Sequence, residues 1–367
     1  MKNVMGIINM INEPDQLEEL TYHRNIASVP FAGRYRLIDF ILSSMVNSGV
    51  TNVGIFTHTK YRSLMDHLGS GKEWDLDRKR SGLFILPPMK EGLDPTNGDL
   101  HTLNAHRDYL HRSSEEYVLI SRSYMVCNID FNGLQEFHNE NKSDITVVYK
   151  ETNDIDSFST RIGMDDSGRV TSMWDPNASP HGNKVSMEMF FLKKSLLLDL
   201  IETSLAEGHH SLMKDAIRAN IGRLNVFGYS YQGYLGIINT LNSYYRHSMN
   251  LLNPNVWREL FFEPGLIYTK IKDEAPTRHI DGGHTSNAMV ANGCVIEGSV
   301  TNSILFRGVH ICKGASVKNS IIMQNGVIHE NTAIDHAIID KDVIVKAERT
   351  LIGHERAPFI VVKRKVI

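Results

Sequence analysis

The chain has 367 residues, of which 22% are charged, and its formal net charge is −3. This length is sufficient for two domains with separate hydrophobic cores. The near-neutral charge excludes a broad basic surface for nucleic acid or for an acidic membrane. Any charged ligand must therefore bind to a local cluster of side chains.

Three cysteines, Cys127, Cys294 and Cys312, are too few and too scattered for a disulfide framework or a four-ligand zinc site. We expect them to be small buried residues in a reducing compartment, and we expect no bound metal. The N-terminus lacks the features of a signal peptide, and no apolar run approaches the ~18 residues of a membrane span. These observations predict a cytoplasmic protein.

Up to about residue 245, short apolar runs alternate with helical patterns, which predicts an open α/β domain with a mostly parallel sheet. The expected strands are Val4–Ile11, Val53–Phe56, Tyr117–Ser121 and Ile145–Tyr149, and the expected helices are Arg36–Ser48, Leu100–His111 and Lys193–Ala206. Ligands of such sheets bind beyond the carboxyl ends of the strands. A site is therefore expected after Ile8 and near Arg122 and Ser123.

The C-terminal part has apolar residues at a six-residue spacing. Cys294, Val300, Phe306 and Cys312 form one series, and Ile322, Ile328 and Ile334 form another after a slip. Such a period predicts a left-handed parallel β-helix with one inward residue from each side of a coil. A β-sandwich is the less consistent alternative. We expect a first domain over residues 1–250, a connector over 251–285 that is rich in proline and glycine, and a β-helix over 286–367.

Two separate segments carry a resemblance to a known family. Residues 28–40 read SVPFAGRYRLIDF, and residues 300–304 and 317–321 of the tail read VTNSI and VKNSI. They resemble the ADP-glucose pyrophosphorylase (glucose-1-phosphate adenylyltransferase) family. The chain is most similar to the non-catalytic regulatory-subunit paralogue of bacterial glycogen biosynthesis. The resemblance implies a nucleotidyltransferase-like (Rossmann-like) mixed sheet followed by the β-helix, in a tetramer that responds to a phosphorylated effector.

The phosphate loop of that family does not match this chain. The family loop reads Gly-Gly-x-Gly-x-Arg-Leu, where glycines allow backbone N–H groups to approach the phosphates. Residues 9–17 read NMINEPDQL, with no glycine or arginine and with two acids, Glu13 and Asp15, that would repel a triphosphate.

Four further family positions differ in charge. The resemblance implies a lysine at Ile26, a metal-binding aspartate at Ser123 (or at Arg122, if the loop shifts by one), a second metal-binding aspartate at Ile237, and a sugar-phosphate lysine at Asp175. Each charge contact in a transition state contributes several kcal/mol. Their joint loss predicts a degenerate active site with no catalytic residues and no cofactor. Mg²⁺ is expected only if the chain is an active enzyme with a rebuilt site.

Three other residues lie at positions where the family has an aspartate. Asp39 and Asp215 match family aspartates, and we interpret both as structural residues that hold local backbone. His101 stands where the family has an aspartate.

A cationic group is retained outside the degenerate site. By the resemblance, His23, Arg24, Arg36 and Arg307 match or lie next to residues that bind a phosphorylated effector, although His23 replaces a lysine and Arg307 is one position early. Several converging guanidinium groups can hold a dianion. For Arg34, a solvated surface position is an equal alternative.

These features favour a regulatory subunit that assembles with a catalytic glucose-1-phosphate adenylyltransferase, as a hetero-oligomer, or else a homo-oligomer. The enzymatic alternative is a divergent sugar-1-phosphate nucleotidyltransferase. A third interpretation is an acyltransferase of the hexapeptide type, with His310, His329 or His336 as its base, but it leaves the large first domain unexplained.

Overall fold

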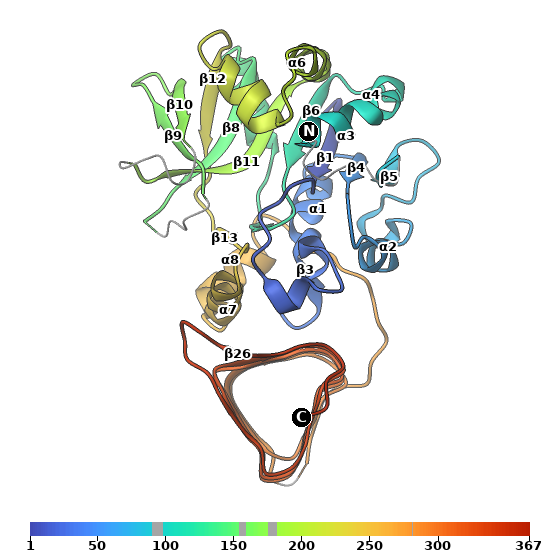
Figure 1. The fold of residues 1–367 in the computed structure, drawn as a ribbon, viewed down its shortest axis with the longest axis vertical. Helices are drawn as coiled ribbons and strands as arrows, with labels where there is room; N and C mark the ends of the chain where they lie inside the picture. The colour runs from blue at the N-terminus through green and yellow to red at the C-terminus, as the bar shows by residue number, and fades with distance from the viewer. Residues whose placement is uncertain (90–97, 154–158, 175–181, 281) are drawn as a thin grey trace. The chain divides into compact units, whose positions relative to one another are not determined.

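The structure, a computed structural model, describes residues 1–89, 98–153, 159–174, 182–280 and 282–367 (Figure 1). It divides into two compact units. The first contains Met1–Pro14, Phe40–Leu235 and Glu263–Tyr268, and the second contains Asp15–Asp39, Gly236–Phe262 and Thr269–Ile367. This division differs from the contiguous domains expected from the sequence, because the early segment Asp15–Asp39 packs with the later segments of the second unit.

A nine-stranded mixed sheet is the centre of the first unit, as far as the described residues show. β1 lies between β4 and β6 and is parallel to both, whereas β11 is antiparallel to β6 and β8. The strands of this unit are β1 (Val4–Asn9), β4 (Asn52–Phe56), β5 (Gly82–Leu86), β6 (Tyr117–Ser121), β7 (Met125–Val126), β8 (Ile145–Glu151), β9 (Arg161–Met164), β10 (Val170–Trp174), β11 (Lys184–Lys193) and β12 (Val226–Ser230).

All six residues of β1 are buried, as its continuous apolar sequence predicts for a strand covered on both faces. The helices are α1 (Leu37–Asn47, which begins in the second unit), α2 (Arg62–Leu68), α3 (Gly98–Ala105), α4 (Arg107–Arg112), α5 (Asn132–Glu140) and α6 (Lys194–Ala206). Among the described residues, no helix combines the length and hydropathy needed to cross a bilayer.

The single helix expected over Leu100–His111 is two helices. His106 leaves helical geometry (φ −100°, ψ 20°), and its Nε2 lies 2.8 Å from the carbonyl oxygen of Pro87. The side chain of His106 therefore has a partner outside the helix, and α4 restarts at Arg107.

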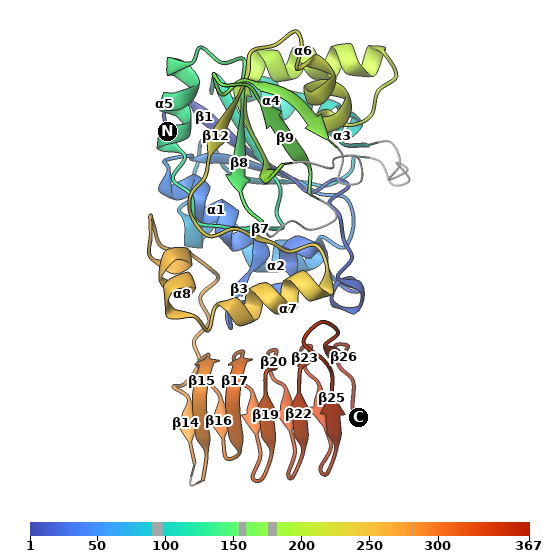
Figure 2. The ribbon, with the colours of Figure 1, turned by 90° about the vertical axis from the view of Figure 1, so that its left-hand side faces the viewer.

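A three-sided parallel β-helix forms most of the second unit, and Figure 1 shows it along its axis. Its strands stack in successive coils (Figure 2). They are β14 (Arg278–His279), β15 (His284–Val290), β16 (Val295–Ile296), β17 (Ser299–Leu305), β18 (His310–Ile311), β19 (Ser316–Lys318), β20 (Ile321–Ile322), β21 (Val327–Ile328), β22 (Ala333–Asp335), β23 (Ala337–Ile339), β24 (Ile344–Val345), β25 (Thr350–Ile352) and β26 (Phe359–Val361). The unit also contains β2 (Pro30–Phe31), β3 (Tyr35–Arg36), β13 (Gly236–Ile237), α7 (Leu241–Asn250) and α8 (Pro254–Phe261).

The pairing of the coils corrects the predicted inward residues. Val300 pairs with Val317, and Val317 pairs with Ile334, so these coils advance by 17 residues rather than by three full hexapeptides. The phase therefore slips by one residue at each of these two steps. Leu305 and Ile311 belong to the β-helix core cluster, whereas the predicted Phe306 and Cys312 do not.

The expected connector is more regular than its composition suggests. Asn253 caps α8 by accepting a hydrogen bond from the backbone N–H of Asn255 at 3.0 Å, and Pro254 occupies the first turn, where a missing N–H costs nothing. The β-helix ladder begins at Arg278, before the expected start at Ser286, because the N–H of Arg278 donates to the carbonyl of Cys294 at 2.9 Å.

The early segment of the second unit is joined to the later elements by buried hydrogen bonds. The hydroxyl of Tyr244 in α7 donates to the carbonyl of Pro30 at 2.8 Å. Tyr245 donates to the carbonyl of Asn319 in the β-helix at 2.5 Å. These contacts place the segment that contains Arg24 and Arg36 in the same compact unit as the β-helix.

Candidate functional site

The carboxyl ends of β1 and β6 lie side by side in the first unit. Ile8 pairs with Ser121 in parallel register, so the residues that follow each strand emerge at one edge of the sheet. This is where the sequence predicted the ligand site, after Ile8 and near Arg122 and Ser123.

Arg122 fills this edge with internal contacts. Its Nη1 donates to the carbonyl oxygens of Asn9 and Ile11 at 3.0 and 2.8 Å, and its Nε donates to Glu188 at 2.9 Å. An oxygen of Asp99 lies 3.7 Å from its Nη2. Although burial opposes its charge, the carboxylates of Glu188 and Asp99 raise the pKa of Arg122. The guanidinium is therefore held by the protein itself.

Both carboxylates are positioned by local structure. Glu188 lies in an irregular stretch of β11 where the pairing with β8 shifts register, and its φ is +50°. A bulge of this kind redirects a side chain. Asp99 accepts hydrogen bonds from the side chain of Asn9 at 2.8 Å and from the N–H of Leu212 at 2.7 Å, which fixes its orientation.

Ser123, one of the degenerate positions, contacts an acid of the altered phosphate loop. Its backbone N–H and its hydroxyl donate to the two carboxylate oxygens of Glu13 at 2.5 and 2.6 Å. Desolvation raises the pKa of Glu13 to about 7 even though Ser123 and Arg122 oppose the shift. The carboxylate of this loop acid is therefore directed toward the ends of the strands.

The charges at this edge do not suit a nucleoside triphosphate. Glu13, Asp99 and Glu188 surround the guanidinium of Arg122. Neutralising a triphosphate needs metal ions and cations that are available to it. These side chains can hold their own loops together, but their net negative charge would repel an incoming phosphate.

The remaining degenerate positions are apolar or lie outside the described residues. Ile26 and Ile237 are 3% and 7% exposed and belong to the second unit. Neither can bind a metal or a phosphate through its side chain. Asp175 lies outside the residues that the structure describes.

The three other matched residues have structural contacts. Asp39 is fully buried and accepts a hydrogen bond from the N–H of Arg36 at 3.0 Å, near the start of α1. Asp215 accepts from the N–H groups of His210 and Ser211 at 3.0 and 2.8 Å, as a residue that holds its loop would. His101 stacks on His210, with 3.2 Å between Nε2 of His101 and Nδ1 of His210.

A cationic cluster lies in the second unit around Arg24. The Nη2 of this buried arginine donates to both carboxylate oxygens of Asp340, at 2.9 and 2.7 Å. Its Nη1 is also buried and has no hydrogen-bond partner among the described residues. A buried donor without a partner costs free energy that an anionic ligand could recover.

Two lysines that the sequence did not indicate complete this cluster. Burial, followed by the charges of Arg36 and Arg24, lowers the pKa of Lys341 to about 7. Burial and then the charge of Arg24 lower the pKa of Lys363. Asp340 therefore faces several cations. The lysines could not be found from the sequence because the coil pairing brings them to Arg24 across more than 300 positions.

The other predicted effector residues differ in their surroundings. His23 is exposed. Arg307 is half-buried, and burial followed by the charge of Arg34 lowers its pKa. Arg34 itself is exposed, donates to the hydroxyl of Tyr35 at 2.9 Å and stacks on its ring. Arg34 and Arg307 thus form a pair of neighbouring cations, so Arg34 is not an isolated surface arginine.

Comparison with known proteins agrees with both parts of the chain. The Nucleotidyl transferase family matches residues 14–253, and the family described as GlmU-like, C-terminal hexapeptide matches residues 273–358. These matches agree with a mixed-sheet nucleotidyltransferase domain followed by a left-handed parallel β-helix.

Two relatives are named glycogen biosynthesis protein GlgD. The one from Bacillus subtilis (strain 168) is 37% identical over 98% of this chain and 96% of its own length. The one from Geobacillus stearothermophilus is 44% identical over 86% of this chain and 82% of its own length. A glucose-1-phosphate adenylyltransferase from Bacillus cereus (strain ATCC 14579) is 28% identical over 93% of this chain and 92% of its own length. The chain therefore belongs to the nucleotidyl transferase family, and it shares more residues with the GlgD proteins than with this adenylyltransferase.

Proposed function

We propose that this chain acts in glycogen biosynthesis as a catalytically inactive regulatory subunit of glucose-1-phosphate adenylyltransferase. The role in glycogen biosynthesis rests on the GlgD relatives, which are similar over nearly the whole chain. The single observation that carries the inactive character is the network of Arg122, Glu13 and Ser123 at the ends of β1 and β6. This network pairs Arg122 with carboxylates of the chain itself, so its charge is not available to a nucleotide.

The partner in this proposal is an active adenylyltransferase subunit. The glucose-1-phosphate adenylyltransferase from Bacillus cereus is similar over 93% of this chain, which supports a common fold for the two proteins. A chain with this fold that lacks the catalytic charges can contribute to an assembly without contributing turnover. No cofactor is needed for this role.

The cluster around Arg24 is the proposed effector site. An effector with a phosphate group would meet the free Nη1 of Arg24 and the positive charge of Lys341 and Lys363. Arg36 lies close enough to Lys341 to lower its pKa, and Arg307 and His23 are the further residues expected from the resemblance. Guanidinium groups bind phosphate strongly because their fork matches two of its oxygens.

The test is an assay of ADP-glucose formation from ATP and glucose 1-phosphate in Mg²⁺, with this chain alone, with the catalytic chain of the same organism alone, and with both after co-purification. We expect negligible turnover from this chain alone, co-elution of the two chains, and a changed rate or effector response in the mixture. Turnover by this chain alone would instead support the divergent-enzyme alternative. Failure to co-elute would reject the assembly.

The effector site can be tested on the purified chain by thermal unfolding with inorganic phosphate. We expect phosphate to raise the melting temperature of the wild type more than chloride does at equal ionic strength. Arg36→Gln should reduce this effect, whereas Arg356→Gln, which removes an exposed arginine of the β-helix, should leave it unchanged. Equal phosphate effects in all three proteins would place the anion elsewhere.

A further inference from the structure

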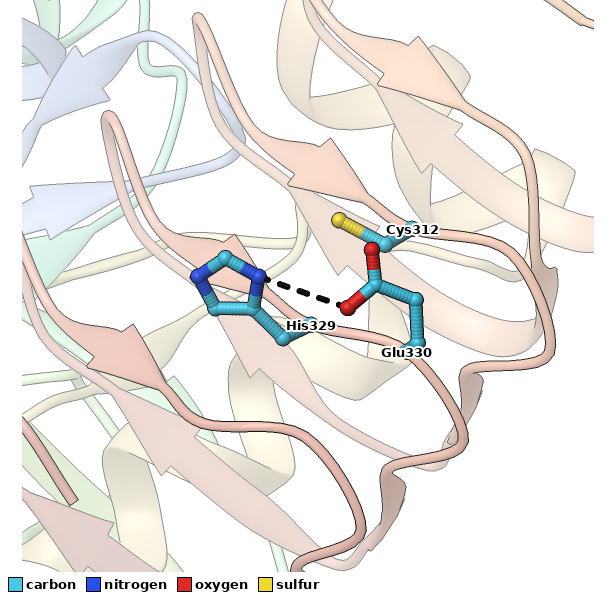
Figure 3. Close-up of side chains that lie close together, drawn as sticks. All are labelled: Cys312, His329 and Glu330. Carbon is cyan, nitrogen blue, oxygen red and sulfur yellow. Dashed lines mark ion pairs between the residues drawn. The ribbon is translucent and has the colours of Figure 1, made fainter.

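Three side chains that can bind metal lie together on the β-helix. Cys312, His329 and Glu330 each offer one ligand atom, and these three atoms lie within 4.8 Å of one another. Figure 3 shows the sulfur, the imidazole and the carboxylate grouped on two successive coils. None of them belongs to the group of residues around Arg122 at the ends of β1 and β6, or to the cationic cluster around Arg24.

Cys312 is outside the β-helix core. The residue before it, Ile311, belongs to the core cluster, and neighbouring residues of a strand point to opposite faces. Cys312 is nevertheless only 6% exposed, so the residues around it on the outer side cover it. The expectation that Cys312 is a small buried residue is confirmed, but its predicted place in the inward-facing series is wrong, because Cys312 does not belong to the β-helix core cluster.

The ladder of the β-helix holds the ligands in place. The N–H of Cys312 donates to the carbonyl of Ile328 at 2.9 Å, which puts Cys312 directly beside His329. The N–H of His329 donates in turn to Val345 of the next coil at 3.0 Å. The backbone of each residue is therefore held by a hydrogen bond to the next coil. Ligand groups on such a rigid support lose little entropy when they bind an ion.

The spacing of the ligand atoms suits a tetrahedral ion. The Nδ1 of His329 lies 3.6 Å from an oxygen of Glu330. With zinc–ligand bonds of about 2.0–2.3 Å, two ligand atoms of a tetrahedral site lie about 3.3–3.8 Å apart. All three ligand atoms lie within 4.8 Å of one another, which exceeds the tetrahedral separation by about 1–1.5 Å at most.

We propose that Cys312, His329 and Glu330 form a zinc site that links two successive coils of the β-helix, with water as the fourth ligand. A thiolate, an imidazole and a carboxylate are all ligands that zinc accepts, and the thiolate disfavours calcium and magnesium. The site is independent of the proposed regulatory role.

The test uses the full chain after treatment with a chelator. Calorimetric titration with Zn²⁺ should give one site per chain, and Co²⁺ should give the absorption band of a cobalt–thiolate bond. Cys312→Ser should abolish that band, and His329→Asn or Glu330→Gln should weaken Zn²⁺ binding by roughly 10-fold or more. His284→Asn, which removes an exposed histidine of β15, is the matched control and should bind as the wild type does.

Circular dichroism of each variant serves to check that the fold is retained. Zinc should raise the melting temperature of the wild type but not that of Cys312→Ser. Zinc binding of equal strength in Cys312→Ser and the wild type would overturn the proposal. So would a cobalt spectrum without the thiolate band, or the absence of zinc binding by the wild type.

Discussion

Two largely enclosed arginines, Arg122 with a side chain 12% exposed and Arg24 with one 5% exposed, show opposite electrostatic outcomes in the two units. Arg122 in the first unit contacts two carboxylates and two carbonyl oxygens. Arg24 in the second unit contacts one carboxylate, Asp340, and keeps a buried nitrogen without a partner among the described residues, close to Lys341. The charge of Arg122 is neutralised by carboxylates of the chain, whereas the region around Arg24 has an excess of positive charge. An arginine in the protein interior therefore indicates a ligand only when its surroundings leave a hydrogen-bond donor unsatisfied.

The largest effect is expected from Arg122→Met. It leaves Glu188 and Asp99 buried without their cation, and breaking a buried pair in this way typically costs about 3–5 kcal/mol. The free energy of unfolding should be measured by urea denaturation. Arg78→Met is the matched control, because Arg78 is paired with the exposed Asp75 and such pairs contribute about 1 kcal/mol or less. A loss for Arg122→Met as small as that of the control would mean that the network is not structural.

A smaller loss is expected from Asp340→Asn. It removes the counter-charge of Arg24, but Lys341 has a pKa of about 7 and can release its proton, so we expect about 3 kcal/mol. Inorganic phosphate should restore part of the lost melting temperature in Asp340→Asn and none of it in Arg122→Met. If phosphate rescues both variants equally, the two regions do not differ in the way described here.

The smallest effect is a pH dependence at Glu13. Its pKa is raised from 4.5 to about 7 in the folded protein, so the folded state binds this proton more tightly than the unfolded state does. The stability that this proton contributes is complete below pH 4.5 and is lost as the pH rises through 7. Glu13→Gln cannot ionise, so its stability relative to the wild type should be higher at pH 8 than near pH 5, by roughly 1 kcal/mol.

Urea denaturation of both proteins at the two pH values measures this difference. Because Ser123 donates to both oxygens of Glu13, Gln can replace only one acceptor, and a constant offset at both pH values is expected in addition. A difference between the two proteins that does not change with pH would show that Glu13 titrates normally.

Much of the candidate site could be predicted from local sequence. The continuous apolar runs gave β1 and β6, and the rule for parallel sheets then placed the site beside Arg122 and Ser123. The absence of glycine from residues 9–17 indicated that no phosphate loop forms there. These inferences needed only neighbours in the chain, because strand and loop propensities depend on short segments.

The partners of the charged residues depended on the tertiary structure. Glu188 reaches Arg122 through a register shift of β11, and Lys341 reaches Arg24 through the stacking of the β-helix coils. The coil step of 17 residues also set Cys312 beside His329. The sequence by itself determined the two folds and the loss of the phosphate loop, because these follow from local patterns. Only contacts between segments distant in the sequence determined which charged side chains are paired and which remain for a ligand. The reason is that the energy of a charge pair depends on the distance between its two groups and on their burial.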